Sequence, residues 1–149
     1  PKTYPLSPAT IDSNKSQIYI LITECIFCYT ICMKHLYHIA KRTDWTAAQK
    51  TGEYTVGSLH RDFFEDGFIH LSYARQVNVV ADLIYHDTLD LVLLTIDPTK
   101  LAAKVVDEKA DFPEEYFPHL YGPLSVDAVI DIRPYRPMSD GKFPIVKSA

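Results

Sequence analysis

The clearest pattern of apolar and polar positions lies in the middle of the chain. Val77, Val80, Ala81 and Ile84 recur at intervals of three and four residues. This spacing places them on one side of a helix, so it predicts an amphipathic helix over residues 74–85. The apolar side of that helix is expected to face the core.

A continuous apolar run, DLVLLTID, follows at residues 90–97. It has the length of a strand, and its lack of alternation predicts a strand that is covered on both faces. Residues 53–66 and 109–118 are turn-rich or rich in acidic and aromatic residues, and we expect surface loops there. Shorter apolar segments predict further strands, at residues 35–39, 68–72, 104–107, 126–132 and 142–146.

A second, earlier helix is predicted from the residues at its ends. Thr43 is a preferred N-cap residue, and Gly52 is typical of the position just after a last helical turn. Together with the strands, the two early helices predict a mixed α+β domain. We expect most of its strands to be antiparallel.

The first 32 residues differ from the rest of the chain. Residues 18–33 are almost entirely apolar, but the run is shorter than the roughly 20 residues that span a bilayer comfortably, and Glu24 interrupts it. Met33 stands just before the first predicted strand. We therefore expect residues 1–32 to be an apolar extension outside the domain, and residues 33–149 to form a single domain.

All the cysteines of the chain, Cys25, Cys28 and Cys32, belong to that apolar run. Cys25 and Cys28 have the C-x-x-C spacing of a redox pair or of half a metal site. We favour a simpler interpretation, in which they are small apolar side chains. No second pair of this kind completes the four ligands of a structural zinc ion.

The composition narrows the classes of function. The chain has 149 residues, a formal net charge of −4 and 47% hydrophobic residues, which suits one domain with a sizeable core. Its scattered basic residues do not indicate a generic nucleic-acid surface, and no membrane span is expected. We expect a small-molecule or nucleotide-like ligand and a cytoplasmic location, and we leave the oligomeric state open.

Three histidines stand in apolar surroundings: His38 in LYHIA, His70 in GFIHLS and His119 in FPHLYGP. A polar side chain in an apolar strand needs a hydrogen-bond partner or a function. His38 and His70 are candidate catalytic residues, because the ordinary pKa of imidazole lies near neutrality. For each of them the alternative is a core histidine that is bonded to the backbone.

Residues near these histidines are candidates for binding a ligand. Ser72 follows His70 by two residues and therefore shares its face of the strand, although a hydroxyl there also suits the start of the next helix. His119 and Tyr121 lie in a segment that two prolines stiffen, and rigid loops often present binding groups. Three histidines are also enough for a catalytic zinc site, but none form a closely spaced pair, so no metal site is predicted.

From Leu36 to about Val146 the chain resembles a widespread family, domain-of-unknown-function nine-five-two. That family in turn looks like a distant relative of the ADP-ribosyltransferase fold, and in particular of the RNA 2'-phosphotransferases, which use NAD. The matching strings include LYHIA at 36–40, GFIHLS at 67–72, VLLTID at 92–97 and FPHLYGPL at 117–124.

The resemblance implies an ADP-ribosyltransferase-like fold with a nucleotide cleft. In such a fold the first-strand histidine, here His38, helps to hold the nicotinamide nucleotide, and the strand with His70 lines the same cleft. Tyr37, in the same matching string, is a further candidate ligand-binding residue. NAD is the cofactor that the resemblance implies, and transfer of an ADP-ribosyl or phosphoryl group is the reaction.

Two departures from those enzymes leave other interpretations open. Ile39 and Ala40 stand where a glycine and a small hydroxyl residue let NAD approach the strand. The phosphate-gripping arginines are not matched either, since only Arg75 lies near the second strand. We expect a domain that binds a nucleotide-like or phosphorylated ligand in a histidine-lined cleft, with NAD-linked group transfer if it is an enzyme. The alternatives are a non-catalytic binding module of the same fold and a metal-dependent enzyme that uses the three histidines.

Overall fold

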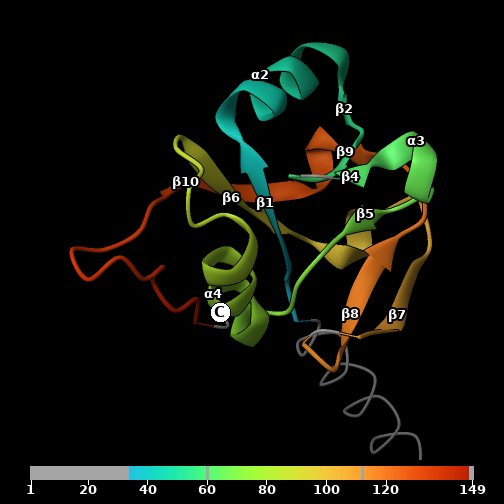
Figure 1. Cartoon of the computed structure of the whole chain (residues 1–149). Coiled ribbons are helices and arrows are strands. Elements are labelled where there is room, and N and C mark those ends of the chain that lie inside the picture. Colours follow the sequence, from blue (N-terminus) through green and yellow to red (C-terminus); the bar gives the residue numbers. More distant parts are fainter. Residues whose placement is uncertain (1–33, 60, 112, 148–149) are drawn as a thin grey trace, which may run out of the picture. The chain divides into compact units, whose positions relative to one another are not determined.

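The central strand of the first sheet is β6 (Leu91–Ile96), in which every residue is buried. It pairs antiparallel with β1 (Leu36–Lys41) on one side and with β10 (Val129–Tyr135) on the other. This confirms the central strand predicted at residues 90–97. The structure, a computed structural model shown in Figure 1, describes residues 34–59, 61–111 and 113–147. The predicted extension over residues 1–32 lies outside the described residues.

The second sheet has the strand order β5 (Ile69–His70), β8 (Glu115–Leu120) and β7 (Val105–Ala110), again antiparallel. The prediction of a loop over 109–118 was wrong, because β7 and β8 fill most of that range. Asp111 and Glu114 lie in the turn between the two strands, and the strand pairing satisfies the backbone in a segment whose composition is typical of loops.

One bridge joins the two sheets. The Tyr37 N–H donates to the Ser72 carbonyl at 2.9 Å, and the Ser72 N–H donates to the Tyr37 carbonyl at 2.8 Å. The bridge stands alone, outside the named strands, so β1 and the β5 segment pair at this point and not along their whole length. It fixes the histidine-bearing segments close to each other.

Helix α2 (Arg42–Thr51) begins two residues earlier than the predicted N-cap Thr43 implies. Lys41 occupies the N-cap without a side-chain capping bond, and the Arg42 N–H donates instead to the Asp90 carbonyl at 2.9 Å. The loop before β6 thus supplies the acceptor that a capping side chain would give. The end of the helix is as predicted, because Gly52 adopts a left-handed conformation with φ of 87°.

Helix α4 (Ala74–Ile84) confirms the amphipathic helix predicted at 74–85. Val77 and Ala81 are buried against the first sheet, whereas Ile84 is exposed and Tyr85 is buried in its place. Figure 1 shows α4 beside β1, on the opposite side of the sheet from α2.

Residues 53–66 form short elements instead of the predicted surface loop. The pair β2 (Glu53–Tyr54) and β9 (Leu124–Ser125) and the pair β3 (Val56–Ser58) and β4 (Arg61–Asp62) are antiparallel, and the short helix α3 (Phe63–Asp66) follows. Tyr54 is among the largest fully buried side chains. The polar composition of residues 53–66 therefore gave no indication that the Tyr54 side chain is buried in the core.

The C-terminal part differs from the prediction in two ways. The predicted strand at 126–132 begins only at Val129, after the short 3-10 helix η2 (Val126–Ala128); a similar turn, η1 (Pro98–Lys100), follows β6. No strand forms at 142–146. Phe143 and Val146 are nevertheless buried beside α4, so this segment supplies apolar side chains without pairing.

The core consists of two apolar clusters on the two faces of the first sheet. One contains Leu36, Ala40 and Tyr54 together with residues of β5, β8 and α2. The other contains Tyr37 and Ile39 together with residues of α4. The fold is α+β, and every strand pairing among the described residues is antiparallel, as the sequence predicted.

Candidate functional site

His38 lies in a closed hydrogen-bond network inside the core. Its Nδ1 is 2.7 Å from the carbonyl oxygen of His70, and its Nε2 is 3.0 Å from the hydroxyl of Tyr54. A carbonyl only accepts, so Nδ1 donates to it, and Nε2 accepts from the tyrosine. The ring is neutral in this arrangement, and neither nitrogen is left for a ligand.

Burial controls the acid–base behaviour of His38. Loss of hydration lowers its pKa to about 4, the His70 carbonyl acts in the opposite direction, and a neighbouring charge on His70 lowers it further. Burial also raises the pKa of Tyr54. The His38 imidazole links β1 to β5 through the carbonyl oxygen of His70, next to the backbone bridge between Tyr37 and Ser72.

His70 and His119 are directly opposite each other on β5 and β8, and their ring centroids are 5.0 Å apart. Phe68 completes this histidine cluster, which also includes Glu108 and Tyr121. The Phe68 ring stacks on His119 with a centroid distance of 4.2 Å and an interplanar angle of 13°. The stacking fixes the plane of the His119 imidazole.

Glu108, on the neighbouring strand β7, orients His119. One carboxylate oxygen of Glu108 accepts from His119 Nδ1 and from the Tyr121 hydroxyl, each at 2.7 Å. The hydrogen bonds from Tyr121 and His119 lower the pKa of Glu108. The carboxylate thus fixes Nδ1 of His119 as a donor and orients the imidazole ring.

His70 has a less complete environment. Burial lowers its pKa, a charge on His119 lowers it further, and the Gly57 carbonyl and Asp66 act in the opposite direction. Its Nδ1 is buried and has no hydrogen-bond partner among the described residues. Burial therefore favours the neutral form of His70 beside His119.

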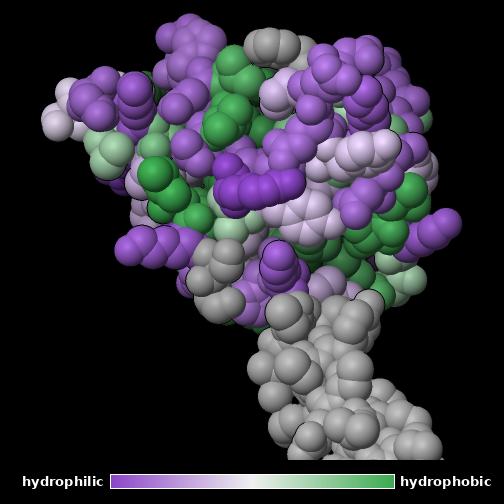
Figure 2. All heavy atoms as spheres, turned by 90° about the horizontal axis from the view of Figure 1, so that it is seen from below, coloured by the Kyte–Doolittle hydropathy of each residue, from purple (hydrophilic) through white to green (hydrophobic). Residues whose placement is uncertain are grey.

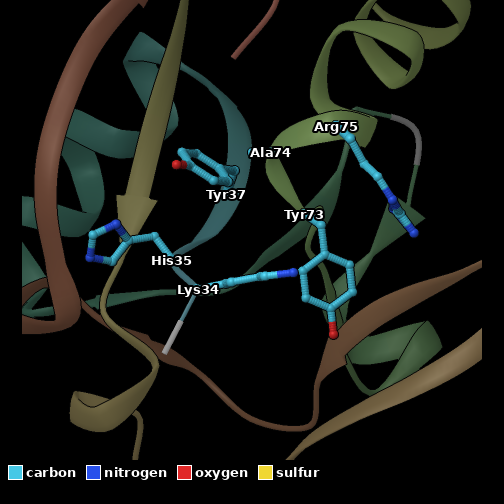
Figure 3. Close-up of a pocket in the computed structure, with 6 residues that line it drawn as sticks. All are labelled: Lys34, His35, Tyr37, Tyr73, Ala74 and Arg75. Atoms are coloured by element: carbon cyan, nitrogen blue, oxygen red, sulfur yellow. The ribbon is translucent and has the colours of Figure 1, made fainter. Parts of the chain in front are cut away.

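A separate hollow of about 340 Å³ opens at the start of helix α4. Figure 3 shows its lining, in which the Lys34 side chain extends toward the ring of Tyr73, and the Arg75 side chain extends away from Tyr37. The described residues that line it include three basic side chains and no carboxylate: Lys34, His35, Tyr37, Tyr73, Ala74 and Arg75. We call it the α4 hollow.

The chain builds the α4 hollow from two adjacent segments. Tyr37 comes from β1, and Tyr73 is the N-cap residue of α4, whose backbone N–H donates to Gln76 Oε1 at 2.9 Å. The N–H groups of Ala74 and Arg75, in the first helical turn, have no acceptor within the helix. They and the helix dipole favour a negative charge at this end of α4.

Tyr73 and Arg75 are each tied to the second sheet by a carboxylate. The Tyr73 hydroxyl donates to Asp107 at 2.8 Å, and burial together with this hydrogen bond raises the pKa of Tyr73 to about 12. Arg75 forms an ion pair with Glu115 and lies 5.8 Å from the centre of the Tyr73 ring. Both carboxylates thus contact residues that line the α4 hollow.

The predicted site residues fall into four surroundings. His70, His119 and Tyr121 come together in the histidine cluster, whereas His38 lies in the core and touches His70 only at its backbone carbonyl. Tyr37 lines the α4 hollow, and Ser72 is buried at the bridge between the sheets. The roles assigned to these residues stay predictions.

Sequence reasoning passed over Lys34, His35, Tyr73 and Phe68. The first two precede the first strand, where no motif marks them. The signal that was available is the basic residue Arg75 at the start of a helix directly after the GFIHLS strand. Such a residue next to first-turn N–H groups is typical of an anion site.

Two further classes of site are absent from the described part of the chain. No three His, Cys, Asp or Glu side chains of residues 34–59, 61–111 and 113–147 are grouped so that they could hold a metal ion. Within the same ranges, no helix has the length and apolar character needed to cross a membrane. Figure 2 shows hydrophobic side chains on the lower face in separate groups, with hydrophilic ones between them.

Comparison with known proteins assigns the chain to a family. Residues 39–132 match the model of the family described as "Protein of unknown function (DUF952)", and the chain belongs to that family. No functionally curated protein matches the sequence.

Solved structures of protein CC0527 from Caulobacter crescentus share the fold. Its crystal structure is 32% identical in sequence, with a TM-score of 0.64 over 74% of this chain and 93% of that one. Its solution NMR structure is also 32% identical, with a TM-score of 0.60 over 72% and 90% of the two chains. The domain is therefore similar to CC0527 over nearly the full length of that protein.

Proposed function

We propose that this domain binds a nucleotide-like or phosphorylated small molecule in the α4 hollow. The observation that supports this is the lining, in which three basic side chains and two tyrosines meet at a helix start without a lining carboxylate. Lys34 supplies one positive charge there and Arg75 a second that is paired with Glu115, and these cationic groups favour an anionic ligand.

The residues of the α4 hollow suit the two halves of such a ligand. A phosphate group fits the first-turn N–H groups of α4 and the ammonium group of Lys34, because both donate hydrogen bonds to anions. The rings of Tyr73 and Tyr37 offer apolar surface to a ribose or a base. A hollow of about 340 Å³ matches the lower end of small-molecule sites, which span roughly 300–1,000 Å³.

We also infer that the fold is ADP-ribosyltransferase-like. The support is the order of the matching strings along the chain, together with two antiparallel sheets that are bridged at Tyr37 and Ser72, since Tyr37 also lines the α4 hollow. A ligand with a diphosphate, such as ADP-ribose or NAD, is accordingly the best candidate.

The geometry favours binding over group transfer. Asp107 and Glu108 are consecutive on β7 and point to opposite faces of the sheet. Asp107 bonds Tyr73 at the rim of the α4 hollow, and Glu108 bonds His119 in the histidine cluster. A small ligand in the hollow therefore has the oriented imidazole of His119 on the other side of the sheet. Of the interpretations that the sequence left open, the non-catalytic binding module agrees best with this placement.

Calorimetric titration with ADP-ribose tests the proposal. We expect binding by the wild type and about tenfold weaker binding by Lys34→Ala, which loses one charge-assisted contact. Lys50→Ala is the matched control, because Lys50 is exposed in the last turn of α2. Absence of binding by the wild type, or equal losses in the two lysine variants, would contradict the proposal.

A second measurement separates binding from catalysis. The protein is incubated with NAD, and the release of nicotinamide is followed by NMR. We expect NAD to stay intact over hours. Nicotinamide release that disappears in His119→Ala would instead establish group transfer and place the histidine cluster in the reaction.

A further inference from the structure

Arg75 lines the α4 hollow, but its charge is already paired with a carboxylate of the same chain. Its guanidinium forms an ion pair with Glu115, the first residue of β8. The side chain of Arg75 is 63% exposed and that of Glu115 is 36% exposed. Both groups are therefore accessible enough to exchange partners at low cost.

The position of Glu115 beside the start of α4 does not depend on this ion pair. The side-chain amide of Gln76 donates to the carbonyl oxygen of Tyr116 at 2.8 Å, and Gln76 is buried. This bond ties the first turn of α4 to the beginning of β8. Glu115 also pairs with Ala110 across the sheet, so its backbone is held from both sides.

We propose that Glu115 occupies, in the ligand-free protein, the place on Arg75 that an anionic group of the ligand takes on binding. This inference rests on the proposed function of the α4 hollow and adds which anionic ligands the hollow selects. A carboxylate and a phosphate present similar oxygen pairs to a guanidinium, so one replaces the other without a change in the arginine's own geometry.

The exchange selects ligands by their charge. Glu115 is tethered beside Arg75, so its effective concentration there is high, and a free monoanion gains nothing that Glu115 does not already supply. A pyrophosphate group carries more charge and also reaches Lys34 and the first-turn N–H groups of α4. The hollow therefore discriminates against simple carboxylates and in favour of diphosphates.

The chain contains a matched control for this pair. Glu114, the neighbour of Glu115, forms its ion pair with Lys109 on β7 and is not a partner of Arg75. Glu114→Gln and Glu115→Gln remove the same charge at adjacent positions. Any difference between the two variants reports on the contact with Arg75 and not on the net charge of the protein.

The experiment is a calorimetric titration of the full chain with pyrophosphate and, separately, with acetate. We expect the wild type to bind pyrophosphate and not acetate. Glu115→Gln should bind pyrophosphate about fivefold more tightly, which is the size of effect that release of an exposed ion pair gives. Glu114→Gln should match the wild type within about twofold, and the gain should disappear when Glu115→Gln is combined with Arg75→Ala.

Four outcomes overturn the inference. Equal affinities of Glu115→Gln and the wild type, or a gain that persists without Arg75, would show that Glu115 does not compete with the ligand, while the proposed function would stand. Acetate binding as tight as pyrophosphate binding would remove the charge selectivity. Absence of pyrophosphate binding in the wild type and in every variant would overturn the proposed function together with this inference. A thermal unfolding curve for each variant serves as the control that the protein is folded.

Discussion

Tyr37 and His38 are neighbours on strand β1, yet they face opposite sides of the sheet and have contrasting surroundings. On the His38 side, each polar atom of the imidazole has a partner within the core. On the Tyr37 side, the sheet meets the start of α4, and the α4 hollow brings basic side chains together without a lining carboxylate.

The contrast distinguishes a polar group that stabilises the fold from polar groups that are accessible to a ligand. A buried group whose hydrogen bonds are all made inside the protein stabilises the fold, and a ligand gains nothing from it. Cationic side chains that line a hollow can instead donate charge-assisted hydrogen bonds to an anionic ligand. His38 thus acts as a link between β1 and β5, and we propose that the ligand binds on the side of the sheet with Tyr37.

The largest effect is expected from His38→Ala. Removing the ring leaves a cavity and deprives the His70 carbonyl and the Tyr54 hydroxyl of their partner, so the free energy of unfolding should fall by about 3 kcal/mol. Urea unfolding measures this. His86→Ala, at an exposed histidine, should change it by less than about 0.5 kcal/mol. A small loss in His38→Ala would remove the structural role of the network.

The second effect is a dependence of stability on pH. The pKa of His38 is about 4 in the folded protein against 6.5 ordinarily, so the neutral ring contributes about 3 kcal/mol in full above pH 6.5. This contribution decreases as the pH falls from 6.5 to 4, because only the unfolded chain takes up the proton in that range. The drop should be absent from His38→Gln, and an equal drop in that variant would assign it to other groups.

A smaller effect is expected from Tyr54→Phe. The variant keeps the ring that packs in the core and loses only the hydroxyl that donates to His38 Nε2. One buried acceptor is left without a partner, which should cost about 1–2 kcal/mol in urea unfolding. Ligand binding in the α4 hollow should not change, because Tyr54 does not line it. A loss of pyrophosphate affinity in this variant would mean that the two sides of the sheet are coupled.

The smallest effect is expected from Glu108→Gln. Glu108 organises His119 and Tyr121 on the face of the second sheet away from the α4 hollow, so calorimetry should find the wild-type affinity for ADP-ribose. The orientation of the His119 ring should change instead, and the NMR signals of its side chain should shift. A strong loss of ADP-ribose affinity would place the ligand at the histidine cluster.

The elements that the sequence predicted well are those with one dominant pattern. Residues 90–97 carry an unbroken apolar run, and residues 74–85 carry an apolar stripe with helical spacing. Each pattern fits only one secondary structure that buries its apolar side chains. Strand β8 and the burial of Tyr54 escaped prediction, because tertiary pairing decides them and their local composition resembles that of loops.

The candidate site could be predicted only in part for a related reason. The pairing of His70 with His119 depends on strand register, which an isolated motif does not specify. Alternation of side chains along β1 predicts that Tyr37 and His38 face opposite sides of the sheet. That the polar atoms of His38 are all hydrogen-bonded within the protein depends on Tyr54 and on the carbonyl of His70. The basic residues Lys34 and Arg75 meet only through the bridge between the two sheets.

The most direct test is NMR mapping of pyrophosphate binding on the backbone amides. Titration of the isotopically labelled protein should shift the amide signals of Ala74 and Arg75 most, with saturation, while those of His70 and His119 stay in place. Shifts centred on His70, His119 and Tyr121, or no saturable shift at the start of α4, would contradict the assignment of the α4 hollow as the binding site.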